Sequence, residues 1–114
     1  MKQLKTIVSW AATASLVGDA WMTHAAPRDY TLLTLRESQQ QLHEQSQIPQ
    51  SLVFPAETRK PLSTSLQNLE HTVAGMIVAV KQKDSAALRR QLHQLTIDQE
   101  VLASLIRKGA SLYE

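Results

Sequence analysis

The sequence predicts an all-α protein, in which an antiparallel helical hairpin and a third, N-terminal helix form a small helical bundle, preceded by a signal-peptide helix. Two segments repeat apolar residues at heptad spacing, and only two residues separate them. Prolines gather between the predicted helices, where they mark a linker. The 114 residues suffice for one modest domain.

Residues 1–25 have the organisation of a secretory signal peptide. Lys2 and Lys5 form a short basic start, and an apolar stretch over residues 7–18 follows. Small residues before the expected cut favour cleavage after Ala25, with Thr23 at position −3. We therefore predict export to the periplasm of a Gram-negative cell. An uncleaved inner-membrane anchor is the alternative, and membrane contact is expected only through this segment.

The first helix of the mature chain is predicted within residues 26–47. Asp29 suits its first turn, because a carboxylate there accepts backbone N–H groups. Leu32, Leu35 and Leu42 form a narrow stripe on an otherwise polar helix. This helix is the weakest of the three, and its docking on the hairpin stays open: parallel, antiparallel or detached.

A linker is predicted over residues 48–61. Pro49, Pro55 and Pro61 punctuate it, and prolines at these positions predict that no continuous helix runs through it. The linker also carries an apolar triplet, Leu52, Val53 and Phe54. Two interpretations remain: the triplet closes one end of the core, or it is an extended recognition segment for a partner.

The helical hairpin is predicted over residues 62–109, with a tail at 110–114. Asp84 is a good N-cap for its second helix, and Gly109 is well placed to end that helix. Each helix carries apolar residues spaced four and three apart, which line one face. The first seam is Leu62, Leu66, Leu69, Val73, Met76 and Val80; the second is Leu88, Leu92, Leu95, Gln99, Leu102 and Ile106.

Apolar residues also lie off these seams, where a two-helix hairpin cannot cover them. Such surplus apolar surface indicates a protein partner or a homo-oligomer. The candidate interface residues are Ala74, Gly75, Val78, Val101 and Leu105, together with the triplet Leu52, Val53 and Phe54. Arg89 and Arg90 sit early in the second hairpin helix, where the helix dipole disfavours cations, so they are candidates for contact with an anionic partner.

Reactive chemistry is sparse. The chain has no cysteine, which excludes disulfides, a thiol nucleophile and cysteine-bound metal. His71 and His93 fall on the outer side of the hairpin, so they do not converge as metal or haem ligands. The sequence predicts no catalytic, cofactor-binding or metal-binding residue, and we expect no enzyme. With 12 basic and 10 acidic residues, the charge is too balanced to indicate nucleic-acid binding.

These features predict a small exported interaction module, acting as an accessory, adaptor or inhibitor subunit of a larger envelope or secretion assembly. One alternative is a periplasmic holdase-like stress chaperone. The other is the uncleaved, membrane-anchored small protein.

Overall fold

The two seams of the predicted hairpin form the centre of the core. A computed structural model describes residues 2–46 and 56–113, with side chains over 5–46 and 60–107. Helix α3 (Ala56–Lys81) buries all six of its predicted seam residues completely. In helix α4 (Ser85–Tyr113), Leu88, Leu95 and Leu102 are buried, and Leu92 and Ile106 are partly buried against the core. The two predicted seams therefore form the buried faces of α3 and α4.

The turn between α3 and α4 follows from its sequence. The backbone N–H of Ala87 donates to Oδ1 of Asp84 at 3.0 Å, so Asp84 is the N-cap that its side chain predicts. Lys83 takes a left-handed conformation with a φ of 55°. The N–H of Asp84 donates to the carbonyl of Ala79 at 2.8 Å, which completes a Schellman motif and satisfies the end of α3.

Helix α2 (Arg28–Ser46) docks on α3 through the narrow leucine stripe. Leu32, Leu35 and Leu42 are buried, as predicted. The guanidinium of Arg28 donates to the carbonyl of Lys81 at 3.1 Å, so the start of α2 lies beside the end of α3. Near the other end, His43 Nδ1 lies 2.8 Å from Glu70 Oε1. These two contacts fix α2 as antiparallel to α3, which settles the docking that the sequence left open.

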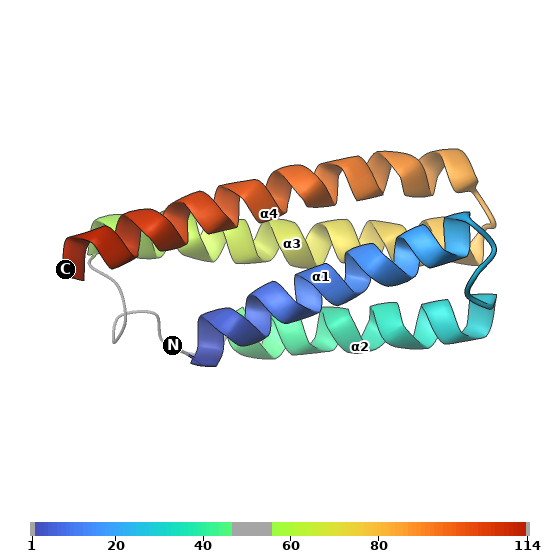
Figure 1. Cartoon of the computed structure of the whole chain (residues 1–114), viewed down its shortest axis with the longest axis horizontal. Coiled ribbons are helices and arrows are strands. Elements are labelled where there is room, and N and C mark those ends of the chain that lie inside the picture. The colour runs from blue at the N-terminus through green and yellow to red at the C-terminus, as the bar shows by residue number, and fades with distance from the viewer. Residues whose placement is uncertain (1, 47–55, 114) are drawn as a thin grey trace.

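Helix α1 (Lys2–Met22), from the predicted signal peptide, is the fourth helix of the bundle. Figure 1 shows α1 lying along α2, and α1 also packs against α4. Its buried positions are Ile7, Ala11, Ala14, Val17 and Gly18, and all of them except Val17 follow the same four-and-three spacing as the seams of α3 and α4. The sequence predicts that this segment lies outside a three-helix bundle, because its apolar run also matches an export signal.

Within the described residues, all regular structure is helical, which confirms an all-α bundle. It is elongated, with extents of 44 × 21 × 19 Å. The two short turns, α1–α2 and α3–α4, lie together at one end (Figure 1).

Two predicted boundaries are wrong. Helix α3 begins at Ala56 and not at Leu62, so Pro61 lies inside the helix and residues 56–61 are not linker. As the sixth residue of α3, Pro61 lacks the N–H that would bond to the carbonyl four residues earlier, and this loss is confined to the first two turns of the helix. Helix α4 continues through Gly109 to Tyr113, so residues 110–113 are not a separate tail. A glycine inside a helix costs only about 1 kcal/mol, so it need not end one. Pro49 and Pro55 lie outside the described residues.

Candidate functional site

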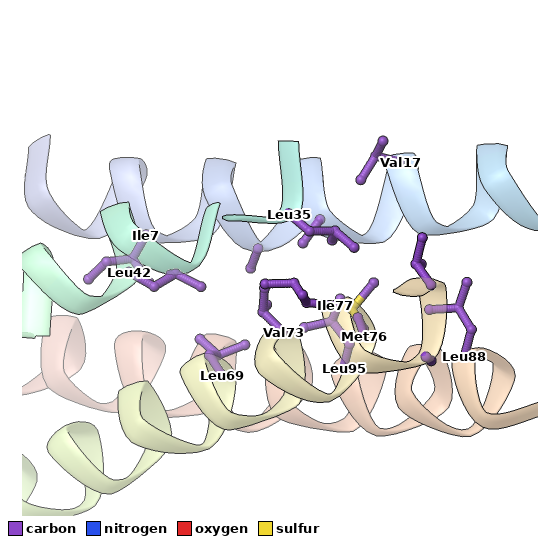
Figure 2. Close-up of a cluster of buried hydrophobic side chains, with 14 of the residues drawn as sticks. Ile7, Val17, Leu35, Leu42, Leu69, Val73, Met76, Ile77, Leu88 and Leu95 are labelled. Atoms are coloured by element: carbon purple, nitrogen blue, oxygen red, sulfur yellow. The ribbon is translucent and has the colours of Figure 1, made fainter. Parts of the chain in front are cut away.

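The seat of α1 is an apolar groove whose walls come from α2, α3 and α4. Figure 2 shows Ile7 of α1 beside Leu42 of α2, with Val73 and Met76 of α3 deeper in the same cluster. Trp10 and Trp21 of α1 are partly buried against this core. The groove therefore holds a whole helix by apolar contact along its length.

At Gly18 the backbone of α1 comes close to side chains of α3 and α4. A Cβ added at Gly18 would lie 2.8 Å from Cε of Met76 and 2.9 Å from Cδ2 of Leu92. Real Cβ atoms do not approach carbon this closely, so any larger residue must displace those two side chains. Small residues on α1 thus let its backbone approach α3 and α4.

The outer face of α1 is unusual for a bundle helix. Leu16 is 71% exposed and Val8 is 46% exposed. No charged side chain occurs between Lys5 and Asp19, so more than three turns of α1 carry no charge, even on the side that faces water. The water-facing side of an amphipathic helix normally carries charged or strongly polar residues. Packing in the bundle explains the apolar inner face of α1. Packing does not require the outer face to be as apolar as it is.

The expected cleavage position lies in the turn between α1 and α2. Thr23, His24 and Ala25 are exposed. His24 has a φ of 64°, and the N–H of Ala25 donates to the carbonyl of Ala20 at 2.7 Å, so α1 ends in a Schellman motif. The bond after Ala25, where cleavage is expected, is thus at the bundle surface, directly beyond the end of α1.

The predicted interface residues of α3 differ in exposure. Val78 is 50% exposed, whereas Ala74 and Gly75 are half-buried. The Gln91 side chain of α4 covers Gly75 so closely that an added Cβ would lie 2.7 Å from its Cδ. Ala74 borders an open depression of about 480 Å³ between α2 and α3. Of the three, Val78 is the exposed apolar side chain.

The predicted interface residues of α4 do lie together. Val101 is 47% exposed, and it shares an open depression of about 420 Å³ with Leu105 and with Ser65 of α3. Ile97, one turn before Val101, is 40% exposed and extends the same stripe, which we call the α4 stripe (Ile97, Val101, Leu105). Sequence reasoning missed Ile97, although its four-residue spacing from Val101 was available.

The remaining predicted site residues are separate from these. Leu52, Val53 and Phe54 lie outside the described residues. Arg89 and Arg90 are exposed in the first turns of α4 and both border a shallow surface depression of about 510 Å³. None of the stripe residues borders that depression, so the arginines and the α4 stripe are distinct surfaces.

A buried polar network that the sequence did not predict joins α3 to α4. Asp98 is only 5% exposed, and its Oδ2 accepts a hydrogen bond from the Thr72 hydroxyl at 2.6 Å. Its Oδ1 accepts a second hydrogen bond from Nε2 of Gln94 at 3.0 Å. Both carboxylate oxygens are therefore satisfied by neutral donors, as a buried carboxylate requires. The sequence feature that could have indicated this network is the position of Asp98 beside the α4 seam.

The described side chains show no group of three or more histidines and carboxylates that could hold a metal ion. His71 and His93 are exposed on the outside of the bundle. His43 and Glu70 form a pair across α2 and α3, with His43 64% exposed. Such a pair supports helix register more than it supports binding chemistry.

Within residues 2–46 and 56–113, no helix combines the length and apolarity needed to cross a membrane. No protein-family model, curated protein or solved structure shows significant similarity to the chain. The geometry of its own surfaces is therefore the basis for a functional proposal.

Proposed function

We propose that the chain is an exported helical protein of the Gram-negative periplasm that acts by binding another protein, as an accessory, adaptor or inhibitor subunit of a larger envelope or secretion assembly. Residues 1–25 serve as its export signal and are removed after Ala25. The mature chain then consists of α2, α3 and α4.

The outer face of α1 carries this proposal. A helix needed only to complete the bundle gains nothing from an uncharged face with Leu16 71% exposed. An export signal requires an apolar run on all sides, because the export machinery and the membrane contact the whole circumference. The lack of charge from Thr6 to Gly18 is therefore accounted for by export rather than by packing.

The turn after α1 supports the same proposal. Residues at −3 and −1 of a signal cleavage site are small, and Thr23 and Ala25 occupy those positions. Both are exposed in the turn between α1 and α2.

Binding rather than catalysis is favoured by the surfaces that remain. The α4 stripe leaves Ile97 and Val101 40% and 47% exposed, respectively. Solvent-exposed apolar stripes of this kind are typical of surfaces that meet another protein. The buried carboxylate of Asp98, in contrast, has its hydrogen bonds satisfied by α3 and α4 themselves.

The export proposal is tested by mass spectrometry of the protein recovered from fractionated cells. We expect a chain that begins at Ala26 in the periplasmic fraction. Thr23→Lys should block cleavage, because it places a long cation at −3, whereas His24→Lys at −2 should be cut normally. Recovery of an intact Met1 in the membrane fraction would contradict cleavage and favour the anchored alternative.

The α4 stripe also favours a second candidate, a holdase-like chaperone, since holdases bind clients through exposed apolar surface. The measurement is suppression of the aggregation of an unrelated unfolded client by the purified exported chain. Val101→Glu should abolish suppression if the stripe binds clients, whereas a matched change at an exposed apolar residue outside the stripe, Leu33→Glu on α2, should not.

A further inference from the structure

We propose that the depression between the first half of α3 and the second half of α4 binds an anionic single-chain amphiphile, that is, an alkyl chain ending in a carboxylate or phosphate group. The depression has a volume of about 420 Å³ and is bordered by residues of both helices. It shares Val101 and Leu105 with the α4 stripe. The inference goes beyond the proposed function and requires neither export nor a protein partner.

A buried hydroxyl at this depression lacks a partner, and this observation points to a ligand. Ser65 borders the depression and is only 3% exposed, and its Oγ has no hydrogen-bond partner among the described residues. A buried hydroxyl without a partner costs free energy, whereas a hydrogen bond from it to a charged acceptor is stabilising. Rotation about the single side-chain torsion of serine can turn Oγ toward the depression, where a ligand oxygen supplies the missing acceptor.

The charges around the depression select an anion as that ligand. Lys60 borders the depression and is exposed, and its ammonium group donates hydrogen bonds but accepts none. Asn68, also on the border, adds an amide donor. None of the described residues that border this depression carries a carboxylate. A carboxylate or phosphate head group can therefore accept from Lys60 and Ser65 together, with no like charge beside it.

The lining of the depression accounts for the alkyl chain. Pro61, Val101 and Leu105 make the lining mainly apolar. Val101 and Leu105 also border a second depression of about 310 Å³, which extends to Ile97. The two depressions adjoin along the α4 stripe, where Ile97 is 40% and Val101 is 47% exposed. An alkyl chain laid along this stripe removes apolar surface from water at both residues.

The position of one acidic residue sets the direction of the ligand. Glu100 borders the second depression, near Ile97, and its carboxylate repels an anionic head group. Lys60 borders only the first depression of the two and attracts that group. The head group therefore lies at the Lys60 end, and the alkyl chain extends along α4 toward Ile97.

Calorimetric titration of the full chain with octanoate and with octyl phosphate tests the proposal. We expect saturable binding, and the tighter of the two ligands identifies the head group. Octanol has the same chain and a neutral head, so it should bind at least about fivefold more weakly. In parallel NMR titrations, backbone amide shifts should change around Ser65 and Val101, and not around Arg89, which borders a different depression.

Ser65→Ala tests the hydroxyl. We expect at least about fivefold weaker binding of the anion, because the hydrogen bond to a charged acceptor is lost. Without ligand this variant should be no less stable than the parent, because the hydroxyl has no partner to lose, so a folding defect does not account for weaker binding. Ser38→Ala removes a buried hydroxyl on α2 and should bind the anion as the parent does.

Lys60→Met tests the charge. Methionine keeps much of the apolar stem of lysine and removes the ammonium group. We expect about threefold weaker binding of either anion and unchanged binding of octanol. Lys81→Met removes a lysine at the opposite end of α3 and should change the affinity of none of the three ligands.

Four results would overturn the proposal. The first is an absence of saturable binding by both anions, and the second is octanol binding as tightly as the anions, which would mean apolar contact alone. The third is unchanged affinity in Ser65→Ala, and the fourth is a set of amide shifts that lies away from Ser65 and Val101. Export is tested separately by the mature N-terminus, so any of these results refutes the ligand site and leaves the proposed function standing.

Discussion

The hydroxyl of Thr72 on α3 donates a 2.6 Å hydrogen bond to Oδ2 of Asp98 on α4, and both residues are at most 5% exposed. This contact lies beside two seams that are apolar except for Gln99. A buried hydrogen bond of this kind sets the register of two helices, because sliding α4 along α3 would leave the carboxylate without its donor. The hairpin is thus held by apolar burial and aligned by one polar pair.

Replacing Thr72 with valine should lower stability, because the valine keeps the shape but removes the hydroxyl that donates a hydrogen bond to Oδ2 of Asp98. We expect a loss of about 1–3 kcal/mol in the free energy of unfolding, measured by urea denaturation. Thr72→Ser retains the hydroxyl and should lose less. Equal losses for the two variants would mean that packing of the methyl group, and not the hydrogen bond, stabilises this position.

Two leucines of α2 form a matched test of how that helix docks. Leu35 is fully buried in the core, whereas Leu33 is 65% exposed. Leu35→Ala should cost about 2–5 kcal/mol by loss of burial and creation of a cavity, and Leu33→Ala should stay within about 0.5 kcal/mol. Thermal or urea unfolding of the two variants decides this. Similar small effects for both would show that α2 is detached from α3 in solution.

Lys83 should be improved by glycine. Its φ of 55° is left-handed, which disfavours side chains with a Cβ and suits glycine. We expect Lys83→Gly to raise the free energy of unfolding by about 0.5–1 kcal/mol. Lys81→Gly, inside the last turn of α3, should instead lower it by about 1 kcal/mol. If Lys83→Gly lowers stability as much as Lys81→Gly, the Schellman turn is not formed.

Ser65 should tolerate alanine better than Ser38 does. Both are buried in helices, but the Ser38 hydroxyl donates to the carbonyl of Thr34 at 2.8 Å, whereas the Ser65 hydroxyl has no hydrogen-bond partner among the described residues. Removing an unsatisfied hydroxyl relieves a desolvation cost, and removing a satisfied one loses a bond. We expect Ser65→Ala to be more stable than Ser38→Ala by about 1 kcal/mol in calorimetry; the reverse order would contradict the orphan hydroxyl.

The sequence predicted the hairpin well because seam position depends on local periodicity. Each of the six seam residues of α3, including Val73 and Met76, is fully buried. The Asp84 cap was equally local, since its partner Ala87 is three residues away. Features of this kind need no knowledge of the rest of the fold.

The role of α1 was beyond such reasoning, because the same residues satisfy two physical requirements. An apolar run from Ile7 to Gly18 suits export, and its Ile7, Ala11, Ala14 and Gly18 subset also follows the heptad spacing of a bundle helix. The composition of this segment indicates an export signal, but it does not reveal that the segment can also pack as a bundle helix. Deciding between the two needs the other three helices, which supply the groove.

The candidate surface was predicted in part for a similar reason. Val78 and Val101 are exposed, as expected of residues off the seams. Gly75 is covered by Gln91 instead, because helix α4 passes close to it. The pairing of Thr72 with Asp98 depends on the relative register of α3 and α4, which periodicity in either helix alone does not set.

The α1–α2 and α3–α4 turns lie at one end of the bundle, and the start of α1 and the end of α4 lie at the other end (Figure 1). Because of this arrangement, the order of the helices along the chain could be changed without changing how they pack. A circularly permuted chain, opened between Ala25 and Ala26 and closed by a linker from α4 to α1, would run α2, α3, α4, α1 and fill the same groove. Such a chain would retain the bundle, whereas α1 would no longer be synthesised first and could not serve as the proposed export signal.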